Sequence, residues 1–165
     1  QHNTQAGYGW IRKGQDFNLR SNTGRERLNI NGAFSFKTLR PLIRTEETIN
    51  AQAAIRLLED LEAAQPVGEI HIIADNARYY RSALVKAHLA TEGCRIQIHF
   101  LPPYSPNLNL IERLWGFFKR KVIYGTYYET FVKFKNATLS FFRDIGKYHQ
   151  ELSTLMTDNF RVVKI

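Results

Sequence analysis

The chain has 165 residues, a length typical of a single domain. Its 23 lysine and arginine residues against 15 acidic residues give a net charge of +8, which favours a polyanionic partner, most simply nucleic acid, although an ordinary basic surface would give the same count. The single cysteine excludes an internal disulfide and a cysteine zinc cage, and no apolar run is long enough to span a membrane.

The amino-terminal part of the sequence predicts two strands. Residues 8–17 are typical of a short strand followed by a basic turn, and apolar residues alternate with polar ones over residues 25–36. We expect these strands to pair antiparallel. Gly32 interrupts the second strand and indicates a bulge or a close approach of another backbone.

The middle of the sequence predicts alternating helices and strands. A helix is expected with the acidic residues 46–47 in its first turn and Gln65-Pro66 at its end. Residues 70–74 are nearly continuous in apolar side chains, which is typical of a strand buried on both faces. A helix over residues 81–92 and a strand over residues 95–101 follow.

The carboxyl-terminal part predicts a rigid loop and three helices. Three prolines in residues 101–106 forbid regular pairing. A helix begins near Asn109 and carries one apolar stripe, another spans about residues 129–144, and residues 148–160 are weakly helical. The stripe consists of Ile111, Leu114, Trp115, Phe118 and Val122. This order of elements predicts an α/β fold with a mixed sheet flanked by helices.

Two acidic residues occupy positions where chemistry is expected. Asp75 follows the strand at residues 70–74, and the carboxyl ends of parallel strands are where ligands bind in open α/β sheets. Glu112 lies in the first turn of the helix after the proline loop. Since neighbouring parallel strands end at the same edge, we expect the two carboxylates to converge there, where they could hold a divalent metal ion.

Each acidic residue also has a structural interpretation. Asp75 and Asn76 could form a turn through side-chain hydrogen bonds, or cap the next helix. Glu112 falls three residues after Asn109, so the pair could form a capping box. Spacing alone leaves both interpretations open.

Basic residues accompany both acidic residues and are the candidates for contacts with a phosphate backbone. The alternative is a solvated helix face. The candidate DNA-binding residues are Arg78, Arg81, Arg113, Lys119, Arg120 and Lys121.

Two segments resemble one known family. They are residues 72–77, Ile-Ile-Ala-Asp-Asn-Ala, and residues 100–115, which hold the Leu-Pro-Pro-Tyr-Ser-Pro run, Asn109, Glu112 and Trp115. Together they resemble the DDE transposase domain of the mariner-superfamily insertion sequences of bacteria. Further likenesses at residues 9–14 and 158–161 extend the resemblance over nearly the whole chain.

The resemblance implies an RNase H-like fold and an enzyme that cleaves and rejoins DNA with three acidic residues and two divalent ions, Mg²⁺ or Mn²⁺. By motif, Asp75 corresponds to the second acid and Glu112 to the third. The resemblance further implies double-stranded DNA as partner, both transposon inverted-repeat ends and target, a homodimer on that DNA, and a cytoplasmic, nucleoid-associated location in bacteria.

The sequence departs from the family pattern at two places. Leu110 stands where the family usually has proline, which affects only the preorganisation of a helix start. The family's first catalytic aspartate precedes the segment around Trp10, where this chain has no acidic residue, and Asp16 is no substitute because it falls in a turn. We therefore expect residues 1–165 to be a catalytic-domain fragment that lacks the first strand and the amino-terminal helix-turn-helix DNA-binding region.

The leading hypothesis is thus the catalytic domain of a DNA transposase, with little or no activity in this chain alone. One alternative is a non-catalytic DNA-binding or assembly remnant of a transposase. Another is a different RNase H-like nuclease.

Overall fold

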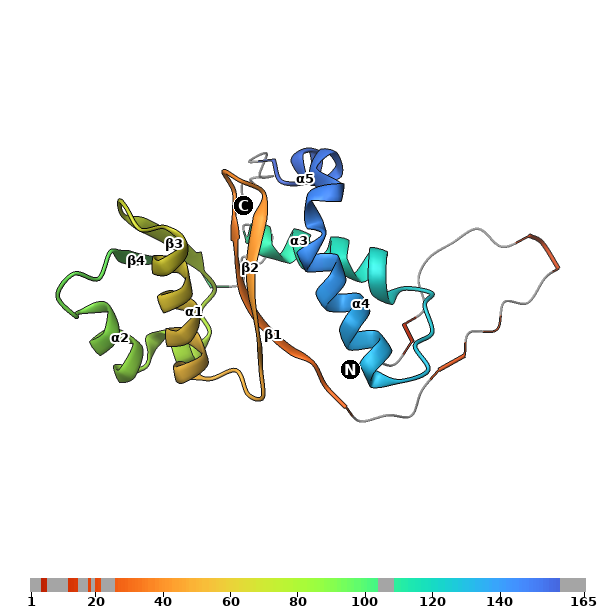
Figure 1. The fold of residues 1–165 in the computed structure, drawn as a ribbon, viewed down its shortest axis with the longest axis horizontal. Helices are drawn as coiled ribbons and strands as arrows, with labels where there is room; N and C mark the ends of the chain where they lie inside the picture. The colour runs from red at the N-terminus through yellow and green to blue at the C-terminus, as the bar shows by residue number, and fades with distance from the viewer. Residues whose placement is uncertain are drawn as a thin grey trace.

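The computed structural model describes residues 4–5, 12–14, 18, 20–21, 26–103 and 109–157. The described elements are β1 (Asn29–Ser35), β2 (Arg40–Glu46), α1 (Ala51–Ala64), β3 (Ile70–Ala74), the 3₁₀ helix η1 (Arg78–Arg81), α2 (Ala83–Leu89), β4 (Ile96–Phe100), α3 (Leu110–Phe118), the π-helical turn η3 (Lys119–Ile123), α4 (Phe131–Arg143), the 3₁₀ helix η4 (Ile145–Tyr148) and α5 (His149–Leu155). Figure 1 shows the β1–β2 hairpin between two groups of elements, with α1, α2, β3 and β4 on one side and α3, α4 and α5 on the other.

The β1–β2 hairpin is antiparallel, with Asn29 opposite Glu46 and Ser35 opposite Arg40. The sequence predicted β1 but not β2. The prediction for Gly32 is confirmed, because a Cβ atom there would lie 2.8 Å from the carbonyl oxygen of Leu42 on β2. The predicted partner of β1, residues 8–17, lies outside the described residues except for residues 12–14.

Helix α1 begins later than the sequence predicted. The prediction that residues 46–47 form its first turn is wrong, because Glu46 ends β2 and the side chain of Asn50 caps the helix by accepting the Ala53 N–H at 2.9 Å. The predicted end is confirmed, because Gln65 is the residue that follows the helix. Glu46 instead forms ion pairs with Arg44 and Arg56, and Arg44 also pairs with Asp60.

Helix α1 also joins its own group of elements to the hairpin. The Asn31 amide on β1 donates to the Ala53 carbonyl oxygen at 3.1 Å, and both residues are buried. The next residue, Ala54, belongs to the apolar cluster that α1 and α2 form with β3 and β4. Ala53 and Ala54 are both completely buried.

Strands β3 and β4 run parallel, with Ile70 opposite Ile96 and Ala74 opposite Phe100. The prediction that residues 70–74 are buried on both faces is wrong, because only the face toward α1 and α2 is covered and Ile73 is 62% exposed. The predicted helix over residues 81–92 is shorter in the structure, because Ser82 caps α2 and η1 precedes it.

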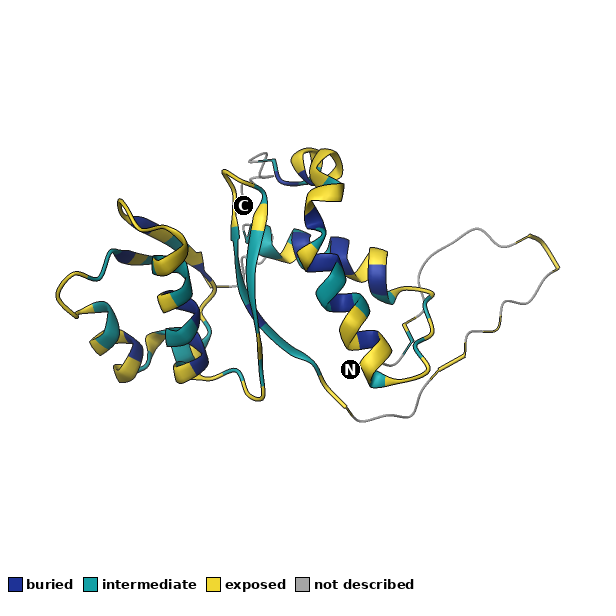
Figure 2. Cartoon of the chain, in the orientation of Figure 1, coloured by how far each residue is buried: buried dark blue, intermediate teal, exposed yellow. Residues whose placement is uncertain are grey.

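The second apolar cluster lies among α3, α4, α5 and the hairpin. The predicted stripe, which runs from α3 into η3, is confirmed, since Leu114, Phe118 and Val122 are buried and Ile111 and Trp115 pack beside them. Figure 2 shows buried segments, in dark blue, along the helices of this group. Rings of Phe118 and Phe142 stack with centroids 5.1 Å apart. In the part of the chain that the structure describes, no helix is long and apolar enough to cross a membrane.

Candidate active site

The edge of the sheet where β3 and β4 end carries Asp75. This residue directly follows β3 and is exposed, and its Oδ1 accepts the Ala77 N–H at 3.1 Å. The turn that the structural interpretation predicted is therefore present. A carboxylate has two oxygens and about four lone-pair positions, so this hydrogen bond leaves the group able to bind a further ligand.

Leu101 ties the two strand ends together. Its N–H donates to the Ala74 carbonyl oxygen at 2.9 Å, and its own carbonyl oxygen accepts from Asn76 Nδ2 at 2.6 Å. Ala74 and Asn76 are the two neighbours of Asp75. The start of the proline loop is thereby attached to both sides of the acidic residue.

Arg81 completes this arrangement from η1. Its Nη2 donates to Asn76 Oδ1 at 2.5 Å, and its guanidinium carbon lies 4.0 Å from the centroid of the Phe100 ring. The sequence predicted Arg81 as a DNA-binding residue and did not predict these contacts, and the one with Phe100 joins segments that are distant in sequence.

Glu112 lies in the first turn of α3 and is exposed. Asn109 caps this helix, with its Oδ1 3.4 Å from the Ile111 nitrogen. Among the described residues the Glu112 side chain has no hydrogen-bond or ion-pair partner, so the reciprocal half of the capping box is not formed there. A carboxylate in the first turn of a helix interacts favourably with the helix dipole.

Asp75 lies at the edge where β3 and its parallel neighbour β4 both end, whereas Glu112 lies further along the chain, in the first turn of α3. Carboxylate oxygens are the ligands that Mg²⁺ and Mn²⁺ prefer, so the donor chemistry of Asp75 and Glu112 fits such ions. No group of three or more His, Cys, Asp or Glu side chains within the described ranges could hold a metal ion. Residues 104–108 of the proline loop lie outside those ranges.

Two tyrosines beside Asp75 were missed by the sequence analysis. Tyr79 and Tyr80 lie in η1 with ring centroids 4.8 Å apart. Burial raises the pKa of both phenols, and the negative charge of Asp75 raises it further. Both hydroxyls therefore stay protonated. In the sequence, the signal that could have identified them is an aromatic pair four and five residues after Asp75.

The six predicted DNA-binding residues differ in what they contact. Arg113 donates to the carbonyl oxygens of Leu155 and Thr157, at 3.1 and 2.7 Å, and so holds the end of α5. Lys121 forms an ion pair with Glu151 at 2.8 Å. Arg78, Lys119 and Arg120 are exposed, and the Arg120 guanidinium lies 5.9 Å from the Phe117 ring.

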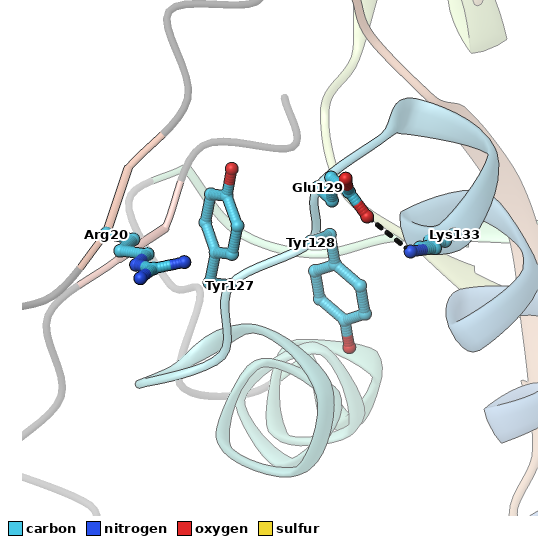
Figure 3. Close-up of a pocket in the computed structure, with 5 residues that line it drawn as sticks. All are labelled: Arg20, Tyr127, Tyr128, Glu129 and Lys133. Carbon is cyan, nitrogen blue, oxygen red and sulfur yellow. Dashed lines mark hydrogen bonds and ion pairs between the residues drawn. The ribbon is translucent and has the colours of Figure 1, made fainter.

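A separate pocket of about 410 Å³ lies at the start of α4, on the far side of the hairpin from β3 (Figures 1 and 3). Lys133 and Glu129 form an ion pair across it at 2.5 Å, which lowers the pKa of the Glu129 carboxyl. Its other lining residues are Arg20, Tyr127 and Tyr128. The sequence analysis did not predict this pocket.

Comparison with known proteins decides the family. Residues 1–135 match the family described as DDE superfamily endonuclease. The chain belongs to this family. The matched residues include both Asp75 and Glu112. Among curated proteins, none matches the chain significantly.

Solved structures of Mos1 transposase share the fold. The paired-end complex with the left transposon end is 15% identical with a TM-score of 0.63, and the strand transfer complex is 16% identical with a TM-score of 0.57. The mariner paired-end complex with Mn is 16% identical with a TM-score of 0.58. Each match covers 98% of this chain and about half of the Mos1 chain, 52–53%. The predicted RNase H-like α/β fold is thereby confirmed. The predicted single mixed sheet is not, because the described strands form two separate sheets, the antiparallel β1–β2 pair and the parallel β3–β4 pair.

Proposed function

We propose that this chain is part of the catalytic domain of a DNA transposase, which cleaves phosphodiester bonds at transposon ends and transfers the strands to a target. The observation that carries the proposal is the match to DDE endonucleases over residues 1–135, which contain both predicted acids. The transposase fold of the Mos1 complexes supports it.

In this proposal Asp75 and Glu112 hold divalent ions, Mg²⁺ or Mn²⁺. When bound in pairs, such ions activate an attacking oxygen and stabilise the leaving oxygen of a phosphodiester. The chain's own contribution is to present two ionised carboxylates. The turn through Ala77 orients Asp75, and the Asn109 cap fixes the start of α3, on whose first turn Glu112 lies.

The family's motif has three acidic residues, whereas the resemblance assigns only two in these 165 residues. We therefore expect the chain alone to have little or no cleavage activity. As a catalytic-domain portion, it would work with a helix-turn-helix DNA-binding region supplied outside these residues.

The proposed partner is double-stranded DNA, which the net charge of +8 favours. Arg78, Lys119 and Arg120 are the exposed candidates for phosphate contacts, and Arg81, Arg113 and Lys121 combine this role with the intramolecular contacts described above. Since the Mos1 neighbours are paired-end complexes, we also propose a homodimer on DNA. A substrate of this kind suggests a nucleoid-associated location in the bacterial cytoplasm.

The second candidate is a DNA-binding or assembly remnant without catalysis. It is favoured by the lack, among the described residues, of a cluster of three ligands. It shares the basic surface with the first candidate but needs no metal at Asp75 and Glu112.

Manganese binding separates the two candidates. Titration of the protein with Mn²⁺, followed by electron paramagnetic resonance, should show binding that Asp75→Asn and Glu112→Gln each weaken. Glu92→Gln, which neutralises an exposed carboxylate elsewhere, is the control. Equal Mn²⁺ binding by the wild type and the three variants would favour the non-catalytic remnant. In a separate assay, Mn²⁺-dependent plasmid nicking by the 165-residue chain, abolished by Asp75→Asn, would overturn the predicted inactivity.

A further inference from the structure

The strand ends at the candidate active site are connected by a short chain of contacts, which we call the Asn76 clamp and define as Arg81, Asn76 and Leu101. Both polar ends of the Asn76 amide are used. Its Nδ2 donates to the Leu101 carbonyl oxygen at 2.6 Å, and its Oδ1 accepts from Arg81 at 2.5 Å. This pairing fixes which way the amide points, and an aspartate could not make the contact to Leu101, because it has no N–H to donate.

Leu101 contacts both chain neighbours of Asp75. The Leu101 N–H binds Ala74 on one side of the acidic residue, and the Leu101 carbonyl binds Asn76 on the other. The backbone of Asp75 is therefore held against the first residue of the segment that leads to Glu112. Within the described residues, no other side-chain hydrogen bond joins the end of β3 to the end of β4.

Arg81 makes two contacts at once that a lysine could not combine. Its planar guanidinium lies over the Phe100 ring, 4.0 Å from the centroid, while one of its N–H groups reaches Asn76. A flat cation that stacks and donates in a fixed direction is specific to arginine. Arg81 and Asn76 are exposed, and contacts at exposed positions contribute little to overall stability. Their effect is to fix the position of the Asn76 side chain relative to the ends of β3 and β4.

We propose that Arg81 and Asn76 are positioning residues, which hold Asp75 and the segment after β4 in the arrangement that lets Asp75 and Glu112 act together. This inference rests on the proposed function and deepens it. It assigns Arg81 a role through Asn76 rather than a role limited to phosphate contact.

Arg78 is the matched control for Arg81. Both arginines lie in η1, both are exposed and both carry one positive charge. Arg78 has no hydrogen-bond or ion-pair partner among the described residues. If Arg81 acts only through its charge, neutralising either residue should weaken DNA binding alike.

The experiment compares Arg81→Lys, Arg81→Gln, Asn76→Asp and Arg78→Gln in a full-length protein that also carries the third acidic residue. Its readouts are DNA cleavage, DNA affinity against salt and hydrogen exchange of the Leu101 amide. We expect both Arg81 variants and Asn76→Asp to lower kcat by about tenfold or more, since small misplacements at a reacting centre have effects of this size. In the same three variants the Leu101 amide should exchange faster. Arg78→Gln should leave the exchange of the Leu101 amide at the wild-type rate, and its DNA affinity against salt gives the size of a lost phosphate contact in η1.

Two outcomes would overturn the inference. In one, Arg81→Lys retains full kcat while Arg81→Gln and Arg78→Gln each reduce the salt slope of DNA binding by about one, which is the effect of a lost phosphate contact. In the other, the Leu101 amide exchanges at the wild-type rate in Arg81→Gln and Asn76→Asp. Failure of the proposed function would look different, because Asp75→Asn would then cleave DNA as well as the wild type, while the exchange result still reports on the clamp.

Discussion

Asn31 on β1 donates a hydrogen bond to the Ala53 carbonyl oxygen in the first turn of α1, at 3.1 Å, and both residues are buried. This contact attaches the hairpin to the helix that also packs on β3 and β4. Asn29, two residues earlier on the same strand, makes a similar contact to the Glu47 carbonyl oxygen at 2.7 Å, but at the surface.

These two asparagines give the first prediction. Asn31→Ala should lower the free energy of unfolding by about 1–3 kcal/mol, because it removes a buried hydrogen bond and leaves a gap. Asn29→Ala should lower it by less, about 0.5–1 kcal/mol, because water replaces an exposed partner. Urea denaturation of both variants measures the difference, and equal losses would contradict the role of burial.

Gly32 gives the second prediction. A Cβ atom there would lie 2.8 Å from the backbone oxygen of Leu42 and 3.0 Å from Cγ2 of Ile43, so Gly32→Ala must push the two strands apart. We expect a loss of about 1–3 kcal/mol, typical of overpacking. In contrast, Gly146→Ala meets no atom within 4 Å and should be neutral or stabilising by up to about 1 kcal/mol. Thermal unfolding of both variants measures these effects. A Gly32→Ala variant as stable as the wild type would contradict the prediction.

Glu46 gives a prediction about pH. Hydrogen bonds from Arg56 and then Arg44 lower the pKa of its carboxyl below its ordinary value of 4.5. A lowered pKa in the folded state means that its stabilisation is complete above about pH 4.5 and is lost as the pH falls through the folded-state pKa. The gap in unfolding free energy between wild type and Glu46→Gln should therefore be constant near neutral pH and shrink in acid.

Denaturation of the Glu46 variant at a series of pH values between about 2 and 7 tests this sign. The comparison variant is Glu129→Gln, which breaks the exposed ion pair with Lys133. Its effect at neutral pH should be smaller. A gap for Glu46→Gln that widens as the pH falls would rule the interpretation out.

Arg113 gives a prediction that separates folding from DNA binding. Its guanidinium holds the carbonyl oxygens of Leu155 and Thr157, so Arg113→Gln should cost about 1.5–3 kcal/mol of stability, as for bonds from a charged group. Lys119→Gln, on an exposed residue of the same basic segment, should leave stability unchanged within about 0.5 kcal/mol. If both residues also contact phosphates, each variant should reduce the salt slope of DNA binding by about one.

Periodicity in the sequence was enough to predict the elements with a strong local signal. The stripe of α3 and the strand β4 follow from spacing, and Asn109 and Gln65 mark helix boundaries through known capping chemistry. Strand β2 was missed because its final residue, Glu46, looks like an acid suited to a helix start. Only the distant partner Arg56 shows that this carboxylate belongs to an ion-pair network.

The candidate site also has a part that the sequence predicts and a part that it does not. Asp75 and Glu112 could be predicted because one follows a strand and the other begins a helix, and both match a family motif. The contacts of Asn76 with Leu101 and of Arg81 with Phe100 could not, because no local pattern encodes a meeting of segments some twenty residues apart. The exposure of Ile73 was missed for a related reason, since an apolar run does not say which face a helix will cover.

Ala53 and Ala54 are adjacent in α1, yet one lies against the hairpin and the other in the cluster with β3 and β4. Both side chains are single methyl groups and both are completely buried, so the helix packs closely against its neighbours at these positions. A bulkier side chain at either position would act as a spacer and would displace one sheet relative to the other. The width of this helix therefore sets the distance between hairpin and acid-bearing edge, and an engineer who wished to tune that distance would begin with these two alanines.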